Sequence, residues 1–392
     1  MIRRDIAPRL QAAAATFPAV TLTGPRQSGK STLCRALFPD HPYANLEAPD
    51  LRAFAIEDPR GFLAQYPDGA ILDEAQRAPD LPSYLQLRID DDPTPGRWII
   101  TGSQNFALLE SISQSLAGRT AVLHLLPMSY VELQRFANAP TTLDEVLLMG
   151  GYPRIFDQSI PASDWLASYV ATYIERDVRT MSAVSDLSTF QRFVQLCAGR
   201  TSQVVNHASI AADAGISQPT AKAWLSLLET SFILTTLPPW SSNTRKRLTR
   251  MPRLHFHDTG LVCWLLGIRN PSQLATHPLR GAVFETWVVS EIIKHRTNRG
   301  ERNGITFYRD QSGLEADALL ETGGGYAIFE AKAGRTVSGD MASAARRVAD
   351  VLGQQAVGMP RVVFGGDTPQ QRSDFRAVPW NELHQELDLL NE

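Results

Sequence analysis

Residues 24–31 have the types and spacing needed to bind a nucleoside triphosphate. They read Gly-Pro-Arg-Gln-Ser-Gly-Lys-Ser and fit the pattern G-x-x-x-x-G-K-[ST] at every defined position. Glycines let backbone N–H groups approach phosphate oxygens, Lys30 supplies charge for the β- and γ-phosphates, and the Ser31 hydroxyl can bind Mg²⁺. We therefore expect ATP and Mg²⁺ at this loop, contacted by Gly24, Pro25, Arg26, Gln27, Ser28, Gly29, Lys30, Ser31 and Thr32.

Two carboxylates end the apolar segment 69–72 that follows this loop in the chain. A carboxylate at the end of a strand beside the loop can hold Mg²⁺, usually through water, and its neighbour can orient the attacking water. We assign Asp73 to the metal and Glu74 to the water, so that binding would lead to hydrolysis. A solvated strand end is the alternative interpretation.

Small polar residues follow the next apolar segment, 97–101. Ser103 and Gln104 could contact the γ-phosphate or its attacking water. The alternative is a strand-to-helix turn in which Ser103 is the N-cap. The residues leave both possibilities open.

The elements that must position these side chains alternate between strand and helix. Strands are expected at 18–23, 43–46, 69–74, 97–101 and 120–126, and helices at 6–17 and 31–38. This alternation predicts an α/β fold with a parallel sheet, helices on both faces and ligands at the carboxyl ends of the strands.

Residues 24–31, 73–77, 101–104 and 116–119 together resemble the AAA+ ATPase module of a large prokaryotic family, and the similarity covers almost the whole chain. The resemblance implies a five-stranded P-loop core and ring-like homo-oligomers in which one subunit's arginine completes the neighbour's site. Arg119 occupies the matching place. It would act as an arginine finger that stabilises charge on the transferred phosphoryl group; a structural ion pair is the alternative.

The middle of the chain has the pattern of a helix-turn-helix. Residues 209–217 place small residues and a glycine before a second helix that Ser217 opens. The basic run Arg245, Lys246 and Arg247, with Arg250 and Arg253 nearby, would form the wing of a winged helix and contact DNA phosphates. A helix-turn-helix that only packs against other parts of the protein is the alternative. The alternating pair His255 and His257 is better explained by one face of a strand than by a metal site.

The last part of the chain places Asp317 at a strand end, followed by a glycine turn and the apolar strand 326–332, where Glu330 and Lys332 share a face. This arrangement resembles the PD-(D/E)xK restriction-endonuclease-like superfamily. The resemblance implies that Asp317, Glu330 and Glu285 bind Mg²⁺ or Mn²⁺ and that Lys332 stabilises the attacking hydroxide or the phosphate. A surface Glu-Lys pair, or an endonuclease fold retained only for binding, are the alternatives.

Composition limits the setting of these sites. The 392 residues carry 38 basic and 41 acidic side chains, so DNA binding would need a local patch. The three cysteines are far apart in sequence, which favours a reducing cytoplasm. A membrane span is not expected, because the sequence contains no run of 18 apolar residues. Length favours two or three domains, expected at 1–136 (ATPase), 137–270 (helical linker and winged helix) and 271–392 (α/β endonuclease-like).

The leading interpretation is a cytoplasmic Mg²⁺-dependent ATP hydrolase that acts on DNA through a winged helix and an endonuclease-like domain, which could be a metal-dependent nuclease. A nucleotide-controlled DNA-binding or assembly module without cleavage is the first alternative. A protein-remodelling ATPase with no nucleic-acid partner is the second.

Overall fold

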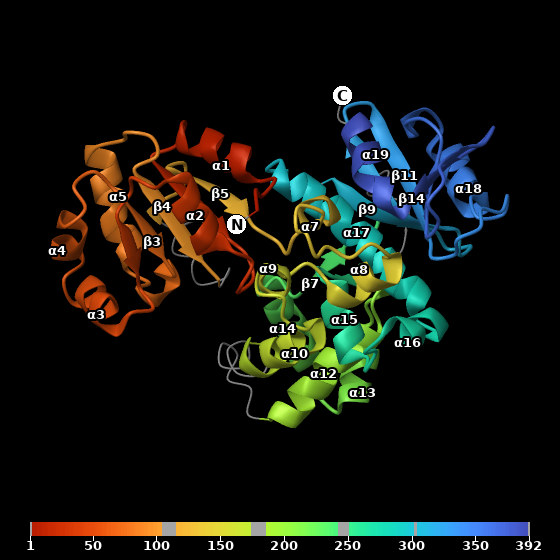
Figure 1. Cartoon of the computed structure of the whole chain (residues 1–392), viewed down its shortest axis with the longest axis horizontal. Coiled ribbons are helices and arrows are strands. Elements are labelled where there is room, and N and C mark those ends of the chain that lie inside the picture. Colours follow the sequence, from red (N-terminus) through yellow and green to blue (C-terminus); the bar gives the residue numbers. More distant parts are fainter. Residues whose placement is uncertain (1, 104–114, 174–185, 242–250, 302–303, 391–392) are drawn as a thin grey trace. The chain divides into compact units, whose positions relative to one another are not determined.

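The computed structural model describes residues 2–103, 115–173, 186–241, 251–301 and 304–390 of the chain. These form two compact units (Figure 1). Unit 1 comprises Met1–Met128, Thr230–Phe232 and Arg296–Glu301, and unit 2 comprises Ser129–Glu229, Ile233–His295 and Arg302–Glu392. Among the described helices, none has both the length and the apolar character needed to cross a membrane.

A five-stranded parallel sheet forms the centre of unit 1. Its order is β2-β3-β4-β1-β5, so the strand that enters the phosphate-binding loop lies between two parallel neighbours. The predicted α/β fold with a parallel-sheet core is confirmed. Because all these strands run the same way, their carboxyl ends lie at one edge. The strands are β1 (Ala19–Thr23), β2 (Tyr43–Asn45), β3 (Ala70–Asp73), β4 (Trp98–Gly102) and β5 (Thr120–His124).

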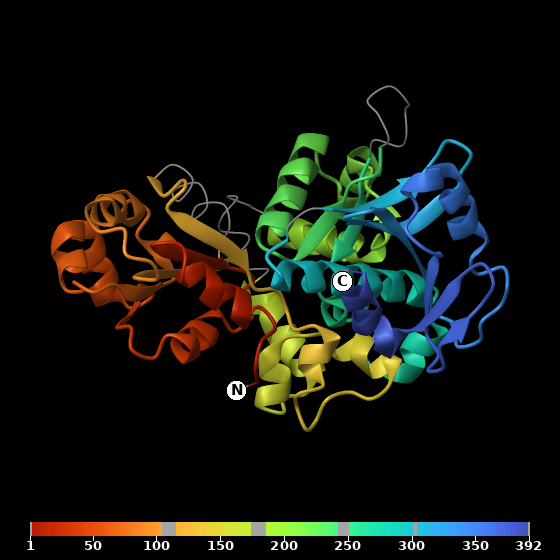
Figure 2. The same ribbon diagram turned by 90° about the horizontal axis from the view of Figure 1, so that it is seen from above.

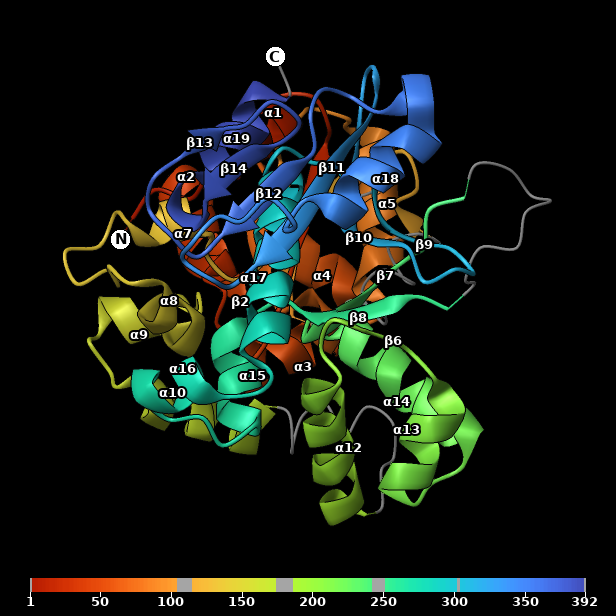
Figure 3. The same ribbon diagram turned by 90° about the vertical axis from the view of Figure 1, so that its right-hand side faces the viewer.

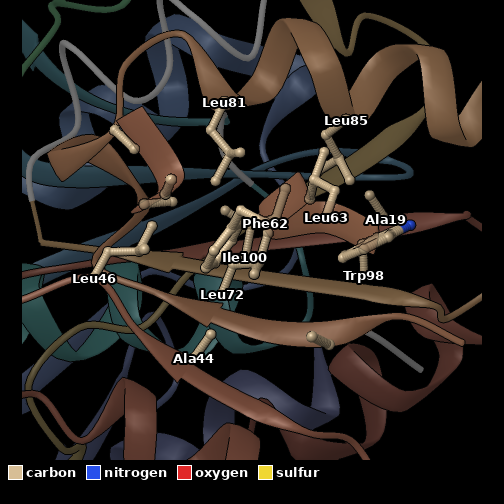
Figure 4. Close-up of a cluster of buried hydrophobic side chains, with 14 of the residues drawn as sticks. Ala19, Ala44, Leu46, Phe62, Leu63, Leu72, Leu81, Leu85, Trp98 and Ile100 are labelled. Atoms are coloured by element: carbon tan, nitrogen blue, oxygen red, sulfur yellow. The ribbon is translucent and has the colours of Figure 1, made fainter. Parts of the chain in front are cut away.

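Helices cover both faces of this sheet because successive strand residues point to opposite faces and both faces are apolar. Val20 and Leu22 join one buried cluster with α1 and α2. Leu72 and Ile100 join another with α4 and α5, where Phe62 lies among them (Figure 4). The elements are α1 (Ala7–Ala14), α2 (Lys30–Leu37), α3 (Pro49–Glu57), α4 (Pro59–Ala64), the 3₁₀ turn η1 (Ala75–Arg77) and α5 (Leu81–Asp91).

The first part of unit 2 is mostly helical. Its central group follows the order α12 (Leu187–Gly199), β6 (Gln203–Val204), α13 (His207–Ala214), α14 (Gln218–Thr230), β7 (Leu234–Leu237) and β8 (Arg253–Phe256). The strands form an antiparallel sheet in the order β6-β8-β7, and the three helices lie together beside it (green in Figure 2 and Figure 3). The remaining helices are α7 (Tyr130–Leu133), α8 (Leu143–Met149), α9 (Pro153–Asp157), α10 (Ala162–Tyr169), α15 (Thr259–Leu265) and α16 (Pro271–Thr276).

Local sequence explains the predicted helix-turn-helix. The Asn206 side chain accepts a hydrogen bond from the Ser209 N–H and so caps α13. Gly215 ends that helix in the left-handed conformation, with φ of 73°. The Ser217 hydroxyl then accepts from the Thr220 N–H at the start of α14. The turn between α13 and α14 therefore lies where the sequence predicts it.

The last part of unit 2 is a mixed α/β structure. Its six-stranded sheet has the order β13-β14-β12-β11-β10-β9, and α18 packs on β10 and β11 through a buried apolar cluster. The elements are α17 (Arg280–Asn298), β9 (Ile305–Arg309), β10 (Glu315–Thr322), β11 (Gly325–Lys332), α18 (Ser343–Leu352), η3 (Gly353–Gln355), β12 (Arg361–Phe364), β13 (Gln370–Gln371), β14 (Arg376–Pro379), η4 (Trp380–Glu382) and α19 (Leu383–Leu389).

The three cysteines are all free and buried. Burial raises the pKa of each thiol, to about 12 for Cys197. Cys34 lies on α2, directly behind the phosphate-binding loop, whereas Cys197 and Cys263 lie in helices of unit 2. The thiols therefore serve as packing groups.

Candidate functional site

The phosphate-binding loop connects β1 to α2 in unit 1. Gly29 precedes the helix with φ of 94°, a conformation that favours glycine. A Cβ on Gly24 would lie 2.1 Å from the Leu125 carbonyl oxygen, so only glycine fits there. Lys30 is buried at the start of α2 and donates to the Gly24 carbonyl (3.0 Å) and the Pro25 carbonyl (2.8 Å). Burial lowers the pKa of Lys30, and the nearby Glu74 and Asp73 oppose that shift.

Arg4 supports the loop from outside the motif. It is 6 % exposed, and its guanidinium donates to the Ser28 carbonyl (2.7 Å) and to the Leu126 carbonyl (2.9 Å). Arg4 could not be predicted from the sequence, because no local pattern links position 4 to position 28. Only the fold brings the start of the chain to the loop.

Asp73 lies at the carboxyl end of β3, beside Ser31 at the start of α2. The Ser31 hydroxyl donates to Asp73 Oδ1 at 3.0 Å. The Thr101 hydroxyl also donates to Oδ1, and the Tyr43 hydroxyl donates to Oδ2. Asp73 is buried, so three hydroxyl groups orient a desolvated carboxylate. Neither Tyr43 nor Thr101 could be assigned a role from the sequence, because both are distant from Asp73 in the chain.

These oxygens fit the Mg²⁺ that the sequence implies. A hydroxyl and a carboxylate are hard ligands, and Ser31 and Asp73 already lie within hydrogen-bonding distance of one another beside the Lys30 ammonium. Ser31 and Asp73 would hold the ion, which would neutralise charge on bound phosphate oxygens when present.

Glu74 directly follows Asp73 and adopts a left-handed backbone conformation, with φ of 55° and ψ of 45°. Such a conformation is unfavourable for a glutamate and is found where surrounding structure enforces it. The Ser103 hydroxyl donates to Glu74 Oε2 at 2.9 Å, and the Gln76 amide donates to the same oxygen. Ser103, at the end of β4, therefore contacts the carboxylate assigned to the attacking water.

The other loop residues have different surroundings. Arg26 forms an ion pair with Glu47, which also pairs with Arg77 (3.2 and 3.3 Å). Gln27 and Thr32 are exposed. Gln104, expected to contact the γ-phosphate, lies outside the described residues.

Arg119 lies just before β5, at the amino-terminal ends of the strands, whereas the phosphate-binding loop lies at their carboxyl ends. Its carbonyl accepts from the N–H of Ala19, the first residue of β1. Its guanidinium forms a two-point ion pair with Asp90 at the end of α5, Nε–Oδ1 being 2.5 Å and Nη2–Oδ2 3.0 Å. The structure thus contains the ion pair that the sequence analysis left open as the alternative. Since β1 spans five residues, roughly 17 Å separates Arg119 from its own phosphate-binding loop.

The predicted site in the last part of the chain gathers as expected, with one addition. Lys332 donates to Glu330 Oε1 at 2.6 Å, and Asp317 Oδ2 accepts from the Ala331 N–H at 2.9 Å. Arg253 of β8 also reaches the cluster, and its Nη1 donates to Glu285 Oε1 (2.7 Å) and Asp317 Oδ1 (3.2 Å).

This arrangement does not fit the Mg²⁺ or Mn²⁺ implied by the endonuclease-like resemblance. A guanidinium already holds Glu285 and Asp317, and an ammonium holds Glu330. Among the described residues, no group of three or more His, Cys, Asp or Glu side chains is arranged to hold a metal ion. Burial first, and then Asp317, raises the pKa of Glu285 to about 8 and that of Glu330 to about 7.

The expected DNA-contacting residues Arg245, Lys246 and Arg247 lie outside the described residues. Arg253, counted in the same basic patch, is buried with its side chain 3 % exposed. The expectation that Arg253 joins an exposed phosphate-contacting wing is therefore wrong. Its carboxylate partners are distant in sequence, so composition alone could not reveal them.

Of the two alternating histidines, His255 lies in β8 and His257 directly follows Phe256, the last residue of that strand. His255 and His257 are both buried, and His255 Nδ1 lies 3.2 Å from the Thr286 hydroxyl of α17. Burial lowers the pKa of His257 to about 3, and lowers that of His255 as well. Both rings are therefore neutral packing groups at physiological pH.

The glycine turn 150–151 contacts the N-terminus of α15. Buried Asp258 accepts from the Gly151 N–H (2.6 Å) and, as the N-cap of α15, from the Leu261 N–H (2.9 Å). Gly150 adopts φ of 68° and ψ of −162°, and a Cβ there would lie 2.3 Å from Asp258 Oδ1. The Asp258 carboxylate thus joins the turn 150–151 to the N-terminus of α15.

Three segments of the chain match known protein families. Residues 16–134 match a family described as an AAA domain. Residues 140–272 and 280–383 match two families described as domains of unknown function, DUF8612 and DUF4143.

Two curated relatives are similar over most of the chain. The uncharacterised proteins Rv2008c of Mycobacterium tuberculosis and Mb2031c of Mycobacterium bovis are each 31% identical over 339 residues, 86% of this chain and 75% of theirs. Among solved structures, the Walker-type ATPase of Pyrococcus abyssi is 17% identical, covers 67% of this chain and 95% of its own, and gives a TM-score of 0.45.

Proposed function

Since the chain belongs to the family of these two mycobacterial proteins and contains an AAA-type P-loop ATPase domain, we propose that it hydrolyses ATP with Mg²⁺ to control a DNA-binding part. The observation that carries the proposal is the meeting of Ser31, Asp73 and Glu74 at the carboxyl edge of the sheet. The phosphate-binding loop alone supports nucleotide binding; the two carboxylates support its hydrolysis.

Lys30 and Glu74 have different roles in the hydrolytic step. The Lys30 ammonium, which donates to two loop carbonyls, would exchange them for the β- and γ-phosphates when ATP binds. Glu74, held by Ser103, orients a water whose oxygen attacks the γ-phosphorus and whose proton passes to the carboxylate. The bond from that phosphorus to the bridging oxygen breaks, and ADP and phosphate leave.

Arg119 is assigned to the site of a neighbouring subunit in a homo-oligomer. It lies too far from its own loop to contact a γ-phosphate there, and its pairing with Asp90 keeps its guanidinium at an accessible edge, with 33% of the side chain exposed. A second subunit that presents its loop to this edge would receive a cation worth about 10³-fold or more in rate.

Arg119→Ala is expected to lower ATP turnover about 10³-fold, and mixing it with Lys30→Ala is expected to restore part of the activity. In mixed oligomers some intact loops face an intact Arg119. Phosphate release from each variant and from the mixture provides the measurement. Asp90→Ala is the matched control, because it breaks the ion pair but keeps the arginine. Equal losses in Asp90→Ala and Arg119→Ala would show that the pair is only structural.

DNA contact is assigned to the winged-helix group of unit 2. The order of three helices and three antiparallel strands, α12-β6-α13-α14-β7-β8, supports a winged helix. In the sequence, the basic run Arg245, Lys246 and Arg247 falls between the residues of β7 and those of β8, where a winged helix would have its wing. Phosphate contacts are the natural use of such a run.

A module that binds DNA or a second subunit without cleaving DNA is the second candidate for the last part of the chain. The specific observation that favours it is Arg253, which neutralises the carboxylates that a nuclease would use for metal ions. In this second candidate function, ATP determines the number of subunits that assemble, and the endonuclease-like domain supplies a binding surface.

The proposed function is tested by measuring ATP hydrolysis and particle size together, with and without ATP and duplex DNA. Lys30→Ala is expected to remain folded, lose turnover and lose any ATP-dependent change in size; wild-type turnover in this variant would refute the ATPase assignment.

Neutralising Arg245, Lys246 and Arg247 is expected to reduce the slope of log DNA affinity against log salt concentration by about 3. Neutralising Arg52, Arg60 and Arg88 in unit 1 is the charge-matched control. No DNA binding at low salt would favour a protein-remodelling role.

A further inference from the structure

Alternate residues of β8 and the segment after it face α17. The His255 ring lies beside the Thr286 hydroxyl, and the His257 carbonyl accepts from the Ser290 hydroxyl at 2.8 Å. Arg253, two residues before His255, extends the same side of the strand toward Glu285. β8 and the residue after it thus contact this helix through the side chains of Arg253 and His255 and through the backbone carbonyl of His257.

At one end of this row of contacts, the Arg253 side chain lies among carboxylates of the last α/β structure. Its guanidinium donates to Glu285 Oε1 (2.7 Å), Asp317 Oδ1 (3.2 Å) and Glu315 Oε2 (2.5 Å). Its Cζ lies 4.7 Å from the centre of the Phe307 ring, which covers one face of the cation. The carboxylates come from α17 and β10, so one side chain joins three elements.

We propose that Arg253 is the built-in cation of this carboxylate site: it takes the place of a divalent metal ion and fastens the three-stranded sheet to α17 and β10. The carboxylates therefore bind the side chain of Arg253 from the same chain, and the last α/β structure needs no metal to be complete.

The geometry favours a guanidinium over a divalent ion. Mg²⁺ requires oxygen ligands at about 2.1 Å in an octahedral arrangement. Glu285 Oε1 and Asp317 Oδ1 instead share one guanidinium nitrogen, and Asp317 Oδ2 is used by the Ala331 N–H. Glu330 Oε1 is used by Lys332, and its Oε2 is buried without a hydrogen-bond partner among the described residues.

A metal ion could enter only by displacing a side chain that is almost fully buried. Removing one partner of a buried ion pair leaves the other charges uncompensated, which is strongly unfavourable. The carboxylates that remain after loss of Arg253 would then attract another cation. The proposal therefore predicts that a latent metal site appears when Arg253 is removed, and that wild type lacks it.

The test is Mn²⁺ binding to full-length protein without nucleotide, measured by electron paramagnetic resonance and calorimetry. Arg253→Met is expected to bind one Mn²⁺ more than wild type, at a site that depends on Asp317 and that wild type lacks. Adding Asp317→Asn to Arg253→Met is expected to abolish that site. Comparison with Asp317→Asn alone separates this cluster from Mn²⁺ at Ser31 and Asp73.

Arg309→Met is the matched control. Arg309 pairs with the same Glu315 from β9 (2.8 Å), but 40% of its side chain is exposed. Arg253→Met is expected to lower the thermal midpoint of unit 2 by roughly 10 °C, because it breaks a buried network. Mn²⁺ should recover part of that loss. Arg309→Met should change the thermal midpoint by less than about 2 °C and should leave Mn²⁺ binding unchanged.

Wild-type protein decides the matter even if Arg253→Met does not fold. Mn²⁺ binding to wild type that Asp317→Asn abolishes would overturn the proposal, as would Mn²⁺-dependent DNA cleavage by wild type that Asp317→Asn abolishes. Arg253→Lys, which keeps a cation beside the cluster, is expected to fold and to bind no Mn²⁺ there; gain of the site in this variant would also overturn it. Loss of ATP hydrolysis has no bearing on these results.

Discussion

Glu74→Gln is expected to reduce ATP turnover by roughly 10³-fold while ATP affinity stays within about threefold of wild type. Glutamine keeps the size of the side chain and can still contact Ser103, but it cannot take the proton of the attacking water. Phosphate release at saturating ATP measures the first effect. Binding of a non-hydrolysable analogue measures the second.

Glu57→Gln is the matched control for this variant. Glu57 is exposed at the end of α3 in the same unit, so its neutralisation changes net charge equally without touching the loop. Wild-type turnover is expected. If Glu74→Gln also kept more than a tenth of wild-type turnover, the carboxylate would not be the group that handles the water, although nucleotide binding by the loop would stand.

Gly150→Ala is expected to lower the free energy of unfolding of unit 2 by about 3 kcal/mol. The new Cβ would need a backbone conformation that only glycine adopts readily, and it would collide with the carboxylate that caps α15. Denaturant unfolding followed by tryptophan fluorescence reports this change, because every tryptophan except Trp98 belongs to unit 2.

Gly281→Ala is the control for that measurement. Gly281 lies in α17 with no heavy atom within 4 Å of an added Cβ, so alanine should be neutral or stabilise by about 0.5–1 kcal/mol. Comparable destabilisation by both substitutions would mean that the contact between Gly150 and Asp258 has no special importance for folding.

Local motifs account for the parts of the structure that were predictable. The loop 24–31, the Asp73–Glu74 pair and the turn at Gly215 are each set by a few adjacent residues, so their element types follow from spacing and backbone preference. The strand expected over 326–332 is likewise found as β11, which spans Gly325–Lys332.

The unpredicted contacts join residues that are far apart in the chain. Arg4 reaches Ser28, Tyr43 and Thr101 orient Asp73, and Arg253 reaches Glu285. An arginine in a basic run has the same local signature whether it faces solvent or a buried carboxylate. The fold decides between the two, and for Arg253 the register of β8 against α17 places it inside.

Burial of Cys34, Cys197 and Cys263 gives the native chain a chemically silent set of thiols. Raised pKa values keep them protonated at neutral pH, and only thiolates react readily with maleimides. A cysteine introduced at an exposed position in each unit, such as Glu57 and Val351, would therefore take up label selectively. Two labels placed in this way would report whether ATP changes the distance between the units.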